Sequence, residues 1–282
     1  MIFMRIDRYL ADMGAGTRSE IKKRIRKDGA RIGGMLIHDP GFLIPDKEPY
    51  PAVEFQGELW RYETTVWYMM NKPSGVLSAS EDRRQKTVLD LIEGQKRKGL
   101  FPVGRLDKDT EGLLLISNDG ELAHRLLSPR FHVNKTYLVR LAATHGPGGC
   151  FTAADRERFA QGLPYDETLT AMPALLEPAP FGKEEEALIT IQEGKFHQIK
   201  KMVAALGNGK EVGYLKRLSF GPLRLDEGLR PGEYRRLSED ECRLLQETAG
   251  QRRSEGEETV PTAGGMFGKE EMTHEQTAGQ DS

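Results

Sequence analysis

The chain has 282 residues, enough for two domains or one large domain with a substantial core. Its 41 basic and 43 acidic residues give a net charge of −2, and eight of the acidic residues but only three of the basic ones lie from Glu247 onward. The two cysteines exclude a disulfide framework and have no metal-ligand spacing. No apolar run is long enough to span a membrane. We therefore expect a cytoplasmic monomer without a membrane partner.

The first 46 residues predict a small module of two helices and a hairpin. Apolar residues recur at helical spacing from Ile6 to Met13, Thr17 and Glu20 have the form of a capping box, and Gly33-Gly34 predicts a turn between short strands. The second helix is basic and fits either a solvated face or a surface that binds a phosphate backbone. Its predicted phosphate contacts are Arg18, Lys22, Lys23, Arg26 and Lys27.

The rest of the chain predicts a linker, a larger domain and a tail. Residues 47–62 are rich in proline and resemble a connector, and residues 247–282 have the composition of a disordered acidic tail. Between them, residues 63–246 mix predicted strands and helices without a regular alternation. This order favours an α+β domain with a mixed, largely antiparallel sheet over a doubly wound fold.

Three groups of residues in this domain could form a site: a loop with Arg105, Asp107 and Asp109, a strand with Lys135 and Tyr137, and a predicted helix with His197, Lys200 and Lys201 on one face. The histidines are scattered and no Walker or dinucleotide motif is present, so we expect no metal and no cofactor. A carboxylate, a cation and an aromatic ring could act without a cofactor, with the carboxylate as nucleophile or base. Each residue also has a structural interpretation, as a loop ion pair, a core tyrosine or a solvated lysine.

The loop sequence GRLDKDTEGLLLISNDG, residues 104–120, resembles the signature of the bacterial RsuA/RluB/RluE/RluF group of ribosomal RNA pseudouridine synthases. The stretches NKPSG, KTYLV, EGKFHQIKKM and GEYRRLSEDE follow in the order that this family shows. The first segment resembles the RNA-binding module named for small-subunit ribosomal protein four. The resemblance covers about residues 4–246 and identifies the chain as a member of this family.

The resemblance implies a role for individual residues. Asp107 takes the position of the family's nucleophile, Tyr137 that of the tyrosine that packs against the flipped uracil, and Lys200 that of the basic residue paired with the aspartate. Arg105 and Lys72 are predicted to contact the substrate. Asp109 falls at a position that the motif does not require, and we interpret Asp119 as part of an Asn-Asp-Gly turn.

The implied reaction converts uridine to pseudouridine in ribosomal RNA: the N-glycosidic bond breaks, the uracil rotates and rejoins the sugar through C5. The predicted target is 16S rRNA, at the position conventionally called uridine 516, and 23S rRNA is the alternative. Two other classes remain open from the residues alone. One is a non-catalytic RNA-binding assembly factor, and the other is a glycoside hydrolase that uses Asp107 and Asp109.

Overall fold

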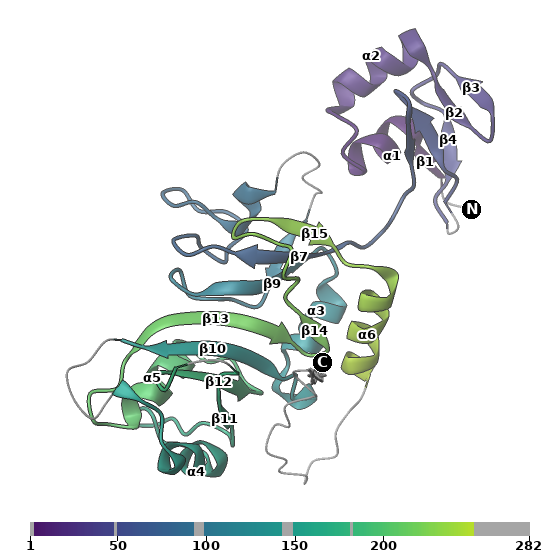
Figure 1. Cartoon of the computed structure of the whole chain (residues 1–282). Coiled ribbons are helices and arrows are strands. Elements are labelled where there is room, and N and C mark those ends of the chain that lie inside the picture. Colours follow the sequence, from purple (N-terminus) through teal and green to yellow (C-terminus); the bar gives the residue numbers. More distant parts are fainter. Residues whose placement is uncertain (1–2, 48–49, 93–98, 143–148, 181–182, 251–282) are drawn as a thin grey trace, which may run out of the picture.

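The structure, a computed structural model, describes residues 3–47, 50–92, 99–142, 149–180 and 183–250. A small N-terminal module and a larger sheet domain follow one another along the chain (Figure 1). The predicted α+β class is confirmed, with a small helix-and-strand module first and a larger sheet domain after it. The predicted tail from residue 251 onward lies outside the described residues.

The N-terminal module packs two helices against short strands. Helix α1 (Ile6–Asp12) follows strand β1 (Phe3–Arg5), which pairs with β4 (Leu43–Pro45). Helix α2 (Arg18–Asp28) begins with the predicted capping box of Thr17 and Glu20 and ends at Gly29, whose φ is 82°. The two apolar residues of α2, Ile21 and Ile25, are fully buried in the core that α2 shares with α1, and its basic residues lie outside this core.

The predicted linker is wrong in extent, because most of it belongs to this module. Strands β5 (Val53–Phe55) and β6 (Glu58–Trp60) join β2 (Ala30–Ile32) and β3 (Met35–Ile37) in one four-stranded sheet. The β5–β6 turn uses Gln56 and Gly57, both at positive φ, as a tight hairpin requires. The Tyr9 hydroxyl accepts a hydrogen bond from the Tyr62 N–H, which fixes the end of this segment to α1.

The larger domain is built on one mixed sheet with the strand order β11-β12-β10-β13-β9-β7-β15, with β14 beside β13 and β8 beside β9. Every pairing is antiparallel except that of β13 with β9. The strands are β7 (Trp67–Lys72), β8 (Phe101–Val103), β9 (Glu111–Ser117), β10 (Lys135–Leu141), β11 (Leu175–Pro178), β12 (Glu186–Ile191), β13 (Val212–Phe220), β14 (Leu223–Arg224) and β15 (Tyr234–Arg236).

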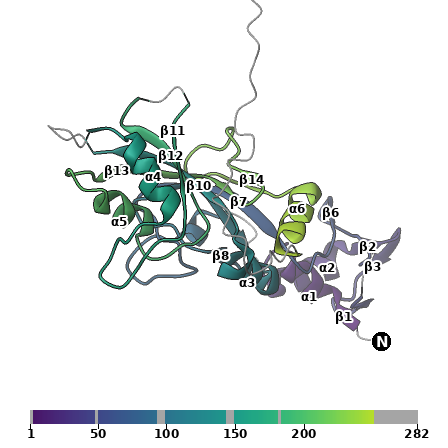
Figure 2. The same ribbon diagram turned by 90° about the horizontal axis from the view of Figure 1, so that it is seen from below.

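Two separate cores cover the two faces of this sheet. On one face α4 (Ala153–Gln161), α5 (Gln198–Ala205) and the 3₁₀ turn η1 (Val88–Leu91) pack with alternate strand residues. On the other face lie α3 (Gly120–Leu127), α6 (Glu239–Gly250) and the 3₁₀ turn η2 (Pro129–Phe131). Figure 2 shows α4 and α5 close together and well apart from α6. The loops at the ends of the strands are therefore supported from both sides.

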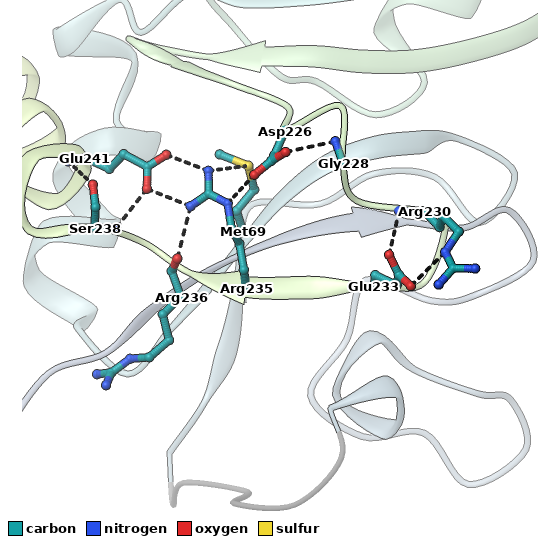
Figure 3. Close-up of polar contacts among 9 residues, drawn as sticks. All are labelled: Met69, Asp226, Gly228, Arg230, Glu233, Arg235, Arg236, Ser238 and Glu241. Atoms are coloured by element: carbon teal, nitrogen blue, oxygen red, sulfur yellow. Dashed lines mark hydrogen bonds and ion pairs between the residues drawn. The ribbon is translucent and has the colours of Figure 1, made fainter.

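The stretch GEYRRLSEDE fastens the edge of the sheet to the last helix. The Arg235 guanidinium donates to Asp226 at 2.6 Å and to both carboxylate oxygens of Glu241 at 2.8 and 2.9 Å (Figure 3). These carboxylates raise the pKa of Arg235 above its ordinary value. Ser238 and Glu241 form the predicted cap, but α6 continues to Gly250, so the predicted domain end at residue 246 falls inside a helix.

Candidate active site

The loop of residues 104–110 is held between β8 and β9 by backbone hydrogen bonds and one serine. The Ser78 hydroxyl accepts from the Leu106 N–H at 3.1 Å and donates to the Leu106 carbonyl at 2.8 Å. Gly112, where β9 passes β13, has a φ of 99°, and a Cβ there would lie 2.2 Å from the Arg217 carbonyl oxygen. The glycines of the motif thus let the loop approach the sheet closely.

Lys72 has a different role from the predicted substrate contact, because its side chain is completely buried. Its ammonium group donates to the carbonyl oxygens of Pro73, Lys108 and Thr110 at 3.0, 3.1 and 2.8 Å. Burial lowers the pKa of Lys72 to about 8, against the opposing effect of nearby carboxylates. Lys72 therefore holds together the backbone on both sides of Asp109, at Lys108 and Thr110, and its buried ammonium is not open to a substrate.

An ion cluster forms where this loop meets the start of α5. Lys200 Nζ lies 3.4 Å from Asp107 Oδ2, as predicted for this pair, but it is closer to Asp109, at 2.6 and 2.8 Å. This hydrogen bond is the main reason that the pKa of Asp109 is lower than usual. His197 Nε2 lies 3.6 Å from Asp107 Oδ1. Lys200 thus bridges both carboxylates of the loop.

The sequence predicts that His197, Lys200 and Lys201 share one face of a helix, but in the structure they do not. His197 is the residue before α5 and has a left-handed backbone with φ 54°, and Lys201 points to Asp166 instead. The interpretation of Asp119 also needs correction: its carboxylate caps α3 by accepting the Leu122 N–H at 3.0 Å. Asp119 and His197 are thus the residues directly before α3 and α5.

Five of the described residues from the predicted groups line one narrow cavity of about 60 Å³: Arg105, Asp107, Tyr137, His197 and Lys200. Ile191 and Leu215 form its apolar wall. Tyr137 is 6% exposed, and its ring is part of the core on that face of the sheet. Asp107 is 24% exposed, so its carboxylate can be reached from the cavity while the loop backbone stays fixed.

Lys135 does not join this cavity, although it lies on the same strand as Tyr137. Its ammonium donates to the Val133 carbonyl and lies 5.3 Å from the centre of the Phe220 ring. Burial, together with Arg217, lowers the pKa of Lys135 to about 7.

A larger cavity of about 630 Å³ opens on the opposite side of the sheet and is lined by Thr136 and Thr190. Residues of the three predicted groups are absent from its wall, so size alone does not locate the site.

The site offers chemistry with a carboxylate, a cation and an aromatic ring. Asp107 can attack or accept a proton, Lys200 places a positive charge 3.4 Å from its carboxylate, and Tyr137 gives a flat apolar surface for a planar substrate. Within the described ranges, no group of histidine, cysteine and acidic residues could hold a metal ion. Among the same residues there is no helix with the length and apolar character needed to cross a membrane.

The basic helix of the N-terminal module divides into two sets. Arg18 and Lys22, with Arg5, surround the fully buried carboxylate of Asp7 at 3.0 to 3.7 Å. Burial alone would raise the pKa of Asp7, but hydrogen bonds from Arg5 and Arg18 lower it below its usual value. The exposed side chains of the other set have no ion pair or hydrogen bond with the part of the chain that the structure describes. They are Lys23, Arg26 and Lys27.

Comparison with known proteins identifies the class of protein that this fold and site define. The family model described as RNA pseudouridylate synthase matches residues 66–205. An uncharacterized RNA pseudouridine synthase of Bacillus subtilis is 44% identical over 247 residues, covering 86% of this chain and 99% of the relative. The ribosomal small subunit pseudouridine synthase A of Vibrio cholerae is 38% identical, covering 84% and 97%, and that of Escherichia coli is 36% identical, covering 84% and 98%.

A solved structure described as a pseudouridylate synthase matches with a TM-score of 0.58 and 33% identity, covering 86% of this chain and 99% of the other. The chain therefore belongs to the RsuA-type RNA pseudouridine synthase family, and it is an isomerase that converts uridine to pseudouridine.

Proposed function

We propose that the chain converts a uridine of 16S ribosomal RNA to pseudouridine, at the position conventionally called uridine 516. Several relatives carry the name ribosomal small subunit pseudouridine synthase A, and they align with this chain over nearly their whole length. The observation that carries the chemical part is the cavity that Asp107 and Tyr137 both line, with the Asp107 carboxylate 3.4 Å from the Lys200 ammonium.

Asp107 is the proposed reacting group. In the isomerisation the bond between N1 and the sugar C1′ breaks, a bond between C5 and C1′ forms, C5 loses a proton and N1 gains one. No electrons are exchanged with a second reactant, so the residues need to supply only a carboxylate, charge stabilisation and a surface on which the base can turn. Lys200 places a positive charge 3.4 Å from the Asp107 carboxylate, and Tyr137 supports the ring.

The N-terminal module, residues 3–62, is the proposed anchor on ribosomal RNA. Lys23, Arg26 and Lys27 point outward from α2 and are available to phosphates, whereas Arg18 and Lys22 neutralise Asp7. Phosphate contacts fix position without reading sequence. The module therefore supplies affinity, and the cavity of the sheet domain supplies the chemistry.

The test is to map pseudouridine in both ribosomal RNAs from cells that lack the protein, by chemical labelling and reverse transcription. Loss of one signal in 16S rRNA, restored by the wild-type gene but not by Asp107→Asn, is the expected result. A signal lost from 23S rRNA instead would move the substrate to the large subunit and keep the chemistry. Unchanged signals in both RNAs would refute the proposal.

A further inference from the structure

An exposed aromatic ring lies at the edge of the catalytic cavity and has no role so far. Phe196 is 75% exposed, the highest value among the large apolar side chains of the described residues. It precedes His197, a residue that lines the cavity and whose left-handed backbone turns the chain sharply into α5. Leaving a phenyl ring in water is unfavourable, so a binding partner that covers it would stabilise the complex.

The Phe196 ring is already ordered by a stack on one side. Its centre lies 3.8 Å from that of the His197 ring, with an angle of 20° between the planes. His197 Nε2 in turn lies 3.6 Å from Asp107 Oδ1. One face of Phe196 is thus covered by imidazole, while the other remains open. A planar group that stacks on the open face lies beyond the His197 ring, and His197 lies next to Asp107 in space.

The surroundings of this ring favour a nucleotide over a protein. A protein hot spot needs a broad desolvated surface, whereas Phe196 stands between charged and polar neighbours such as Lys195, which pairs with Glu193. Arg105 lines the cavity and Lys108 follows three residues later in the same loop. Both side chains are exposed and make no ion pair or hydrogen bond with the described residues. An aromatic platform combined with unpaired cations is the arrangement that binds single-stranded nucleic acid.

We propose that the open face of Phe196 is a nucleotide subsite, which stacks on an unpaired base adjoining the target uridine while Arg105 and Lys108 contact its phosphates. The inference rests on the proposed function. Turning the target base into the cavity removes its stacking partner from the neighbouring base. Phe196 replaces that partner, and because every base has a π face, the subsite accepts any base. It contributes to binding and not to bond making.

The experiment uses the full chain and an RNA fragment around the uridine mapped above, with 2-aminopurine placed on either side of the target. Phe196→Ala, Phe196→Leu and Phe196→Tyr are compared with wild type, and Leu244→Ala, an exposed leucine on α6, is the control. We expect wild type and Phe196→Tyr to quench 2-aminopurine at one flanking position. Phe196→Ala should lose this quenching and raise KM or Kd by about five- to a hundredfold, with the single-turnover rate at saturation within threefold. Phe196→Leu should resemble Phe196→Ala.

The outcomes separate the two proposals. If wild type forms no pseudouridine in the fragment, the proposed function fails, whereas quenching measured on Asp107→Asn still tests the subsite. Equal KM and equal quenching in wild type and Phe196→Ala would overturn the subsite. Full rescue by leucine would show that area and not stacking matters, and a lower rate with unchanged KM would show that Phe196 only positions His197. Either result contradicts the inference.

Discussion

Two carboxylates, Asp7 in the N-terminal module and Asp107 in the sheet domain, are both surrounded by cations, yet their settings differ. The Asp7 side chain is completely buried and is contacted by three cations, two of which donate hydrogen bonds to it. Asp107 is 24% exposed, and its nearest cation lies at 3.4 Å and is closer to Asp109. A fully paired carboxylate stabilises a fold, whereas a partly exposed one beside a shared cation remains available to a substrate.

The largest expected effect follows from Asp107→Asn, which removes the reacting group and keeps its shape. We expect the single-turnover rate of pseudouridine formation to fall by at least about ten-thousandfold, since replacing a nucleophile removes the reaction path itself. Asp109→Asn is the matched control, and its rate should stay within tenfold of wild type because Lys200 can still approach Asp107. Normal turnover by folded Asp107→Asn would refute the assignment.

Lys200→Met should have the next largest effect. Without the ammonium, the Asp107 carboxylate loses its nearest cation, the positive charge that supports the reacting carboxylate beside an uncharged base. We expect the rate to fall by about a hundredfold, equivalent to about 2.7 kcal/mol, with little change in RNA affinity. Lys201→Met is the comparison, since Lys201 pairs with exposed Asp166. If Lys200→Met turns over normally and only binds weakly, Lys200 is a phosphate contact.

Lys72→Met tests whether the buried Lys72 ammonium stabilises the loop that carries Asp109. Three backbone carbonyls would lose their donor, so the free energy of unfolding should fall by about 3 kcal/mol. Urea denaturation of Lys72→Met and of Lys108→Met measures this directly, because the Lys108 side chain is exposed and should be neutral to stability. Equal stability of the two variants would contradict a stabilising role for the hydrogen bonds that Lys72 donates to the three carbonyls.

The smallest effect concerns the outward set of cations on α2. Replacing Lys23, Arg26 and Lys27 by glutamine should reduce the slope of log affinity against log salt by about three, since each lost phosphate contact removes about one. Binding to 16S rRNA fragments at several salt concentrations gives the slope, with Arg156→Gln on α4 as control. A slope equal to that of wild type would mean that this face of α2 meets only solvent.

The fold class and the position of Asp107 were predictable because they depend on local pattern. Alternating strands, capping boxes and glycine-bracketed turns leave clear periodicities, and the signature around Asp107 lies in one stretch. The prolines near the β5–β6 hairpin suggest a connector, while the burial of Val53 and Phe55 depends on a core that residues far apart in the sequence build together, which a linear pattern does not contain.

The errors in the site have a similar origin. Lys72 is predicted as a substrate contact, and only the tertiary structure shows three carbonyls converging on its ammonium. His197 was assigned to a helix face by its spacing to Lys200, but it precedes the helix. The sequence shows Phe196 as an aromatic residue within a charged stretch. Whether such a residue is buried or exposed depends on the fold, which leaves Phe196 exposed.

The most direct test of the account is to measure stability and chemistry together for Asp7→Asn and Asp107→Asn. Hydrogen exchange followed by peptide mass spectrometry reports the module and the sheet domain separately, and a single-turnover assay reports isomerisation. The account predicts that Asp7→Asn loses about 2 to 3 kcal/mol of protection in the module and turns over at a near-normal rate with saturating enzyme. Asp107→Asn should keep wild-type protection and lose turnover. The reverse pattern, or loss of both properties in Asp107→Asn, would contradict the division between a structural and a reacting carboxylate.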